Sequence, residues 1–135
     1  MEIWNASSLA QALPAESFSS VVVNDHALKV QLKDHADLEV AIVISDKYVT
    51  AQAVLCPVAA VEAVTDVDEF NKGLLFATKA LHLSSFAIET INDVECYVIL
   101  AEFTSSTIIE NVLIELNTLA ENAFEVSTEI SNKQA

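Results

Sequence analysis

The strongest constraint on the fold is an alternation of apolar and polar residues in the first half of the chain. Apolar residues occupy every second position from Leu28 to Leu32 and again from Leu38 to Ile44, and a third strand-like run covers 48–55. A period of two residues predicts strands that bury one face. The turns at 34–37 and 45–47 are too short for a crossover connection, so neighbouring strands must pair antiparallel. We therefore expect a meander over residues 21–56, which begins with the apolar run 21–23 and the turn signal at Asn24.

Helical spacing replaces this alternation in three other segments. Asn5 or Ser7 is expected to cap a short first helix. The capping-box pattern occurs at Asp66 and again at Thr107, each time followed by apolar residues three and four positions apart. The predicted helices cover residues 5–13, 66–82 and 107–128.

Two further strands are expected between the second and third helices. Residues 85–91 and 94–103 are joined at Asn92-Asp93, a typical hairpin turn. Residues 58–64 are compatible with either a loop or one helical turn. The predicted order is α-βββ-α-ββ-α, which gives one α+β domain over residues 1–135. Its five-stranded antiparallel sheet would carry the long helices on one face.

The apolar content of the chain predicts a homodimer. Apolar residues make up 53% of 135 residues, which is high for a single domain. We expect apolar side chains on the second face of two strands, at positions 41 and 43 and at 49, 51 and 53. Gly73, inside the second helix, would allow close approach of another element. A second copy is the expected cover for these surfaces.

Charge and glycine content exclude several classes of function. The net charge is −14, with six Lys and no Arg. Nucleic-acid binding depends on basic residues, so no nucleic-acid partner is expected. The single glycine excludes a glycine-rich phosphate-binding loop. The longest weakly polar stretch, 51–64, is too short to span a bilayer, so we expect no direct membrane insertion. The N-terminal residues show no secretory signal, and a cytoplasmic location with two reduced thiols, Cys56 and Cys96, is expected.

No motif for catalysis, metal or cofactor binding stands out. His26, His35 and His82 are far apart in sequence and fit solvated turns or a helix end better than a metal site. Cys96 lies in an alternating strand, where burial would keep its thiol protonated. We expect no catalytic residue, metal ligand or cofactor.

The last helix carries the most distinctive charged pattern. Glu121, Glu125 and Glu129 follow one another at intervals of four residues, and no basic residue occurs between 104 and 132. Like charges at this spacing weaken a helix slightly. Two interpretations remain open: a solvated face, or a docking strip for a basic segment of a protein partner.

Four short patterns give the chain a resemblance to a known family. They are D-x-x-x-F-N-x-x-L-L at 66–75, L-S-S-F-x-I at 83–88, S-S-T at 105–107 and E-x-x-x-L-A-x-N at 115–122. Together with Trp4, Leu9 and Leu13, they resemble the YjfI-type family of uncharacterised bacterial proteins. The element order also resembles type III secretion chaperones and YbjN-like proteins, which are small, acidic and usually dimeric binding domains.

The resemblance implies a partner but no chemistry. YjfI-type proteins are commonly encoded beside a member of the phage-shock-protein-A family, a membrane-stress coiled-coil protein, which becomes a candidate partner. No catalytic residue carries over. The first hypothesis is a non-enzymatic protein-binding module, chaperone-like or regulatory. The alternative is a small-molecule-binding protein or small enzyme with a site of dispersed residues, such as Tyr48 and Tyr97. A deep pocket with perturbed titrating groups would favour the alternative, and an apolar patch or free strand edge would favour the module.

Overall fold

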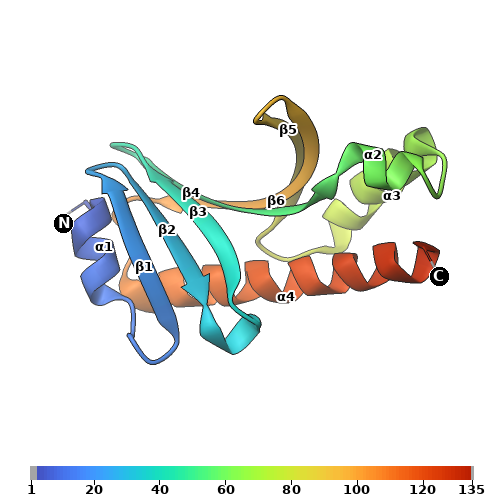
Figure 1. Cartoon of the computed structure of the whole chain (residues 1–135). Coiled ribbons are helices and arrows are strands. Elements are labelled where there is room, and N and C mark those ends of the chain that lie inside the picture. Colours follow the sequence, from blue (N-terminus) through green and yellow to red (C-terminus); the bar gives the residue numbers. More distant parts are fainter. Residues whose placement is uncertain (1–2, 135) are drawn as a thin grey trace.

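A computed structural model describes the backbone of residues 3–134 and the side chains as far as residue 128 (Figure 1). It contains helices and strands in the predicted order, with one additional strand and one additional short helix. The elements are α1 (Ala6–Ala12), β1 (Phe18–Asn24), β2 (Ala27–Leu32), a 3-10 turn (Lys33–His35), β3 (Leu38–Ile44), β4 (Tyr48–Pro57), α2 (Val58–Glu62), α3 (Val67–Ala80), β5 (Ser85–Ile91), β6 (Val94–Thr104) and α4 (Ile109–Gln134).

The described strands form one antiparallel sheet of six, in the order β1-β2-β3-β4-β6-β5. The α+β class and the antiparallel pairing are confirmed, whereas the predicted count of five strands is wrong. The additional strand is β1, which extends the short apolar run 21–23 in both directions. It was missed because an edge strand with six exposed residues has no alternating buried face to reveal it.

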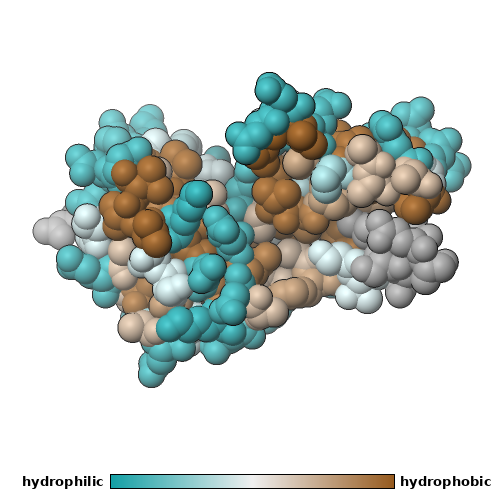
Figure 2. Space-filling view, in the orientation of Figure 1, coloured by the Kyte–Doolittle hydropathy of each residue, from teal (hydrophilic) through white to brown (hydrophobic). Residues whose placement is uncertain are grey.

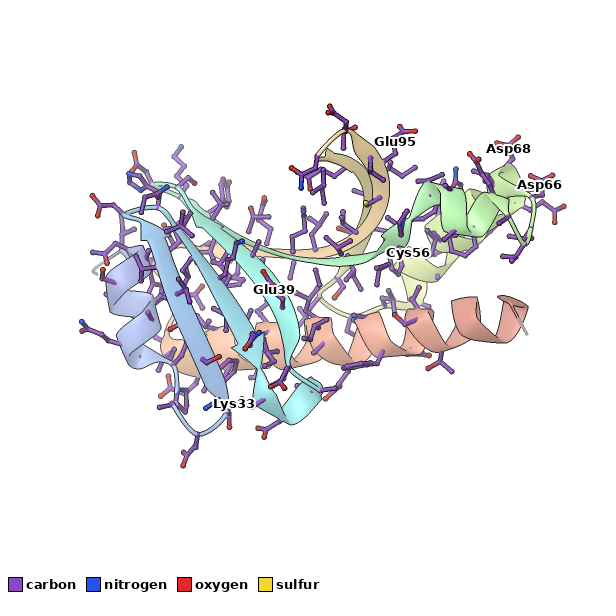
Figure 3. The ribbon with its side chains drawn as sticks, in the orientation of Figure 1. Lys33, Glu39, Cys56, Asp66, Asp68 and Glu95 are labelled. Atoms are coloured by element: carbon purple, nitrogen blue, oxygen red, sulfur yellow. The ribbon has the colours of Figure 1, made fainter. Side chains whose placement is uncertain are left out.

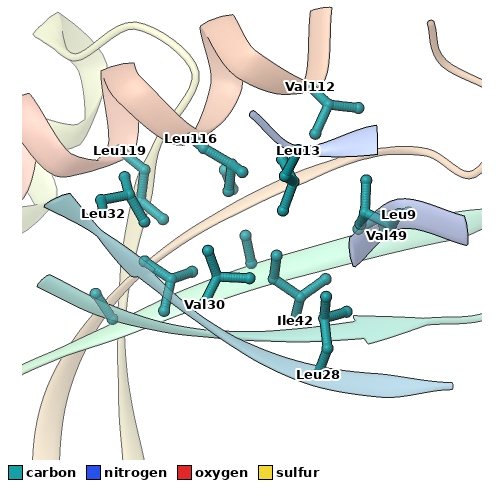
Figure 4. Packing of buried hydrophobic residues seen from close by; sticks show 14 of the residues in the cluster. Leu9, Leu13, Leu28, Val30, Leu32, Ile42, Val49, Val112, Leu116 and Leu119 are labelled. Carbon is teal, nitrogen blue, oxygen red and sulfur yellow. The ribbon is translucent and has the colours of Figure 1, made fainter. Parts of the chain in front are cut away.

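One face of the sheet builds the main core. Alternate residues of β2, β3 and β4 point toward α1 and the first half of α4, as the period of two requires (Figure 4). Leu28, Val30, Ile42 and Val49 are at most 1% exposed. This core fixes the sheet and leaves its other face to solvent.

A smaller second cluster lies where the sheet curls. The β5–β6 hairpin bends away from the first four strands, and α2 and α3 pack beside it (Figure 1). Val58, Val61, Phe70, Tyr97 and Val126 form this cluster. Because Val126 is in α4, the last helix connects the two clusters.

The helix boundaries follow their caps. Asn5 caps α1 and exchanges hydrogen bonds with Ser8, whose backbone N–H lies 2.8 Å from Asn5 Oδ1. Asp66 caps α3 by accepting from the backbone N–H groups of residues 68 and 69. α4 begins at Ile109, later than predicted, because the Thr107 hydroxyl pairs with that of Thr104 at 2.6 Å.

One of the sequence observations behind the expected homodimer is wrong, and a second, Gly73, has no packing explanation within a single copy. Val49, Ala51 and Ala53 lie in the main core and not on the second face. A Cβ atom at Gly73 would meet nothing within 4 Å, so no element of the described chain approaches there. Val43 does lie exposed on the open face, as expected. The dimer itself stays a prediction.

Among the described residues, no helix combines the length and the apolar character that crossing a bilayer requires.

Candidate functional site

The histidines and thiols do not assemble into a reactive centre. The described residues contain no group of three or more His, Cys, Asp or Glu that could hold a metal ion. His35 Nε2 lies 3.1 Å from Asn117 Oδ1, and its ring stacks on Phe124, so it joins the 3-10 turn to α4. His26 and His82 are exposed at separate places. Each has a structural or solvated position instead of a shared site.

Cys56 and Cys96 occupy neighbouring strands as free thiols. Burial, and to a lesser degree the nearby Cys96 thiol, raises the pKa of Cys56. Cys96 is 7% exposed, and its Sγ lies 3.7 Å from the carbonyl oxygen of Val94. A raised pKa keeps a thiol protonated, so Cys56 is poorly suited to act as a nucleophile.

An apolar groove lies between α3 and the hairpin. It has a volume of about 280 Å³. Its lining comes from three elements: Asn71, Leu74 and Leu75 of α3, Phe86, Ala87 and Ile88 of β5, and Tyr97 of β6. We call this surface the α3–β5 groove.

Local sequence explains how these residues meet. Positions 71, 74 and 75 share one side of α3 because they are three and four residues apart. Phe86 and Ile88 share one face of β5, and Ile88 lies directly opposite Tyr97 of β6. The face that carries Ile99 into the main core therefore carries Tyr97 into this second region.

Tyr97 forms the floor of the groove. It is 1% exposed, and its ring packs against Phe70 with 5.0 Å between centroids. Its hydroxyl donates a hydrogen bond to Asn71 Oδ1. Burial, followed by Cys56 and Glu62, raises the pKa of Tyr97, so the phenol stays neutral and cannot serve as a base. Its role is to hold α3 against β6.

The rim of the groove leaves large apolar side chains in solvent. Leu75 is 74% exposed and Ile88 is 47% exposed. Phe76, the next residue of α3, is 70% exposed but does not line the groove. Hydrophobic surface gathers along the β5–β6 hairpin at this end of the molecule (Figure 2). Single exposed apolar residues are ordinary, but a group around a concavity is typical of an interaction site.

Acidic residues surround this apolar surface. Residues 58–96, which build α2, α3, β5 and the start of β6, contain seven acidic residues and two lysines. Asp66 and Asp68 project from the α3 end, and Glu95 projects from the hairpin (Figure 3). The groove is therefore an apolar surface within an acidic part of the sequence.

The predicted acidic strip is separate from the groove. Glu121 and Glu125 are exposed on α4, and neither lines the groove. The side chain of Glu129 lies outside the described residues. Tyr48 lines a different hollow with Ile3 and Lys47, so the two tyrosines do not form a common site.

Sequence reasoning missed the α3–β5 groove. The helical spacing of apolar residues after Asp66 predicted α3, but it did not show that Leu75 would be left uncovered. One sequence feature could have indicated it. Leu75 and Phe76 are adjacent large apolar residues, and one apolar stripe on a helix is too narrow to bury both.

The fold has relatives among solved structures. An uncharacterised protein from Methanothermobacter thermautotrophicus superposes with a TM-score of 0.64 at 15% identity, over 94% of this chain and 96% of that one. YbjN from E. coli superposes with a TM-score of 0.61 at 16% identity, over 95% of this chain and 92% of its own. At these identities the likeness shows the fold, and it confirms the expected YbjN-like architecture.

Sequence comparison identifies closer relatives. The uncharacterised protein YjfI of Escherichia coli strain K12 is 29% identical over 126 residues, which is 92% of each chain. The O157:H7 protein of the same name matches equally well. Both agree with the YjfI-type resemblance of the four sequence patterns. A family model described as "Uncharacterized protein conserved in bacteria" covers residues 3–133, and the chain therefore belongs to this family, DUF2170.

Proposed function

We propose that this protein is a non-enzymatic protein-binding module, chaperone-like or regulatory, that holds an apolar segment of a partner in the α3–β5 groove. The observation that carries the proposal is the exposed apolar rim, Leu75 and Ile88, beside a groove with a buried floor. Burying a leucine or isoleucine side chain contributes roughly 1.5–3 kcal/mol, which is enough for such residues to anchor an interface.

Charge selects the class of partner. The chain has a net charge of −14, and residues 58–96 contain seven acidic residues but only two lysines. Basic flanks on the bound segment would be steered toward this surface. Complex formation should accordingly weaken as salt is added, because exposed charges are screened over about 8 Å at 0.15 M.

A member of the phage-shock-protein-A family is the first partner to test. The support for it is the YjfI-type resemblance, and the groove adds a surface that could receive one of its amphipathic helices. Helix-in-groove recognition uses apolar anchors three and four residues apart on the incoming helix.

The alternative of a small-molecule site has weaker support. The groove, at about 280 Å³, lies at the lower limit of the volumes typical of ligand pockets, about 300–1,000 Å³. Its polar groups, Asn71 and Tyr97, already bond to each other. A protein side chain or helix face suits this surface better than a small polar ligand.

Adjacent residues of α3 provide a matched test. The phage-shock-protein-A-family protein of the same bacterium would be titrated with the wild-type chain, Leu75→Ser, Ile88→Ser and Phe76→Ser. Leu75 and Phe76 are similarly exposed, but Leu75 lines the groove and Phe76 does not. We expect Leu75→Ser and Ile88→Ser to weaken binding about tenfold or more and Phe76→Ser to leave it within about twofold.

Two results would count against the proposal. Equal effects of Leu75→Ser and Phe76→Ser would show that binding does not use the groove. If the titrated protein does not bind, affinity capture from the native host with the same variants replaces it. A failure to find any protein whose capture depends on Leu75 would then overturn the groove as a docking site.

A further inference from the structure

The second edge of the sheet has properties that the groove does not explain. β1 is the outermost strand on its side, and six of its seven residues are exposed. Its sequence, FSSVVVN, contains no charged residue and no proline. Val21 is 66% exposed and Val23 is 58% exposed, and hydrophobic surface lies over this side of the sheet (Figure 2). Natural proteins usually protect such edges with charges, proline or a cover.

The hydrogen bonds around β1 show which backbone groups are available. Lys33 N–H donates to Ser17 C=O at 2.9 Å, so this opposed pair is a hydrogen-bonded one. Opposed pairs alternate between bonded and non-bonded in an antiparallel ladder. Phe18, opposite Leu32, is therefore turned away from β2, in agreement with the bond that its N–H donates to Pro14 C=O. The same alternation turns the N–H and C=O of Ser20 and Val22 toward the free side.

Charge identifies the partner of this edge. Residues 17–33 contain one acidic residue, Asp25, and two lysines, Lys29 and Lys33, in a chain with a net charge of −14. Two copies of such a chain repel one another over most of their surface, and the near balance of charge in residues 17–33 makes this repulsion weak at the β1 edge. The opposite edge, β5, carries Glu89 and lies within the acidic residues 58–96, which we call the acidic lobe, so it suits a basic partner and not a second copy.

We infer that two copies of this chain pair through β1, antiparallel about a two-fold axis. The Ser20 and Val22 backbone groups of each copy bond to those of the other, and the two sheets become one continuous sheet. The valines of both strands cover each other across the axis. Two-fold pairing of one strand with itself is the closed arrangement that leaves no further β1 edge free. This inference does not rest on the α3–β5 groove, which lies at the other end of the sheet (Figure 1).

Ser20→Pro is the most direct test. Proline removes an N–H that points away from β2, so the β1–β2 ladder keeps its own bonds, and proline is tolerated on edge strands. The molar mass would be measured by light scattering over a range of concentrations. We expect twice the chain mass of 14.6 kDa for the wild type and the single chain mass for Ser20→Pro.

A second variant keeps the inference testable if Ser20→Pro does not fold. In Val21→Glu the new carboxylate lies opposite Lys29 within its own sheet but faces like charge across the dimer axis. Val94→Glu is the matched control, because it adds the same charge at a valine that is 47% exposed on the hairpin. We expect Val21→Glu to be a folded monomer by circular dichroism and light scattering, and Val94→Glu to stay a dimer.

The dependence on salt concentration distinguishes this inference from the proposed function. Dimerisation through β1 should strengthen as salt screens the repulsion between the copies, whereas partner binding at the groove should weaken. A wild-type protein that is monomeric at every concentration and salt level overturns the inference. A dimer that survives Val21→Glu overturns it equally, since the copies would then meet through another surface.

Discussion

At the scale of single residues, Gly73 shows how a sequence pattern can be right and its explanation wrong. A glycine inside α3 was expected to mark a close packing contact. The structure leaves the space around it empty, and the residue is exposed. Its position in the helix could be predicted from the spacing of Phe70 and Leu74. Its lack of neighbours could not, because that depends on which side of α3 faces the hairpin.

Gly73→Ala should therefore stabilise the protein. Alanine favours the helix over glycine and loses less backbone entropy on folding. We expect the free energy of unfolding to rise by roughly 0.5–1 kcal/mol in urea denaturation, with the molar mass unchanged. A loss of stability, or a loss of dimer, would show that a second copy approaches at Gly73 after all.

Glu115 is a second residue whose surroundings could not be predicted from the sequence. It lies in a hollow with Glu102, Ser84 and Ser85, and its Oε2 atom is buried without a hydrogen-bond partner among the described residues. Burial raises the pKa of its carboxyl group. A carboxyl whose pKa is raised by folding favours the folded state when protonated, so its ionisation lowers stability as pH rises through that pKa.

Glu115→Gln should remove this effect. We expect the variant to be equally or more stable than the wild type at neutral pH, by less than about 1 kcal/mol because the side chain is partly solvated. The difference should shrink at acid pH, where the wild-type carboxyl is protonated. Glu121→Gln, at an exposed position of the same helix, is the control for thermal unfolding at both pH values. A variant that is less stable at neutral pH would mean that the Glu115 carboxylate has a partner, such as water, that Gln cannot replace.

At the scale of elements, the strands that could be predicted from sequence are those that bury one face. β2, β3 and β4 bury one face, so their alternation identified them. β1 buries almost nothing and was recognised only as the three valines 21–23. The α3–β5 groove could not be predicted because it forms only when the hairpin bends toward α3. That tertiary arrangement, and no local sequence pattern, brings Leu75 and Ile88 to one surface.

The acidic strip of α4 remains a prediction at this scale. Replacing Glu121, Glu125 and Glu129 together with Gln relieves like-charge repulsion at i,i+4, which is worth a few tenths of a kcal/mol per pair. We expect equal or higher thermal stability and, if the strip helps to attract a basic segment, weaker binding of the protein partner at low salt. Unchanged binding with unchanged salt dependence would identify the strip as a solvated face.

At the scale of the whole molecule, two edges of one sheet are suited to different partners. The acidic lobe around β5 presents an apolar groove, and the nearly neutral side around β1 presents free backbone groups. The electrostatic difference between the two edges reflects an uneven distribution of the 20 acidic residues and six lysines. In a dimer joined at β1, the two grooves would lie at opposite ends of one continuous sheet and could each hold a partner segment.

The same charge distribution predicts how stability responds to salt. The ion pair of the described residues, Lys29 Nζ to Glu39 Oε1 at 3.9 Å, joins two exposed side chains and contributes little. Repulsion among the unpaired carboxylates should therefore dominate, and salt should stabilise the fold. Between about 0.01 and 0.15 M the screening length falls from about 30 to about 8 Å, and most of the gain should occur there.

Thermal unfolding of the monomeric Val21→Glu variant isolates this effect from dimerisation. We expect a gain of order 1 kcal/mol, or roughly 4 °C in Tm, between these two salt concentrations. A further slow rise at higher salt would reflect changes in solvation of apolar surface, which continue after the charges are screened. If Tm falls instead on adding the first salt, attractive pairs outweigh repulsion in the folded state. That result would contradict this prediction of net repulsion among the carboxylates of one folded chain.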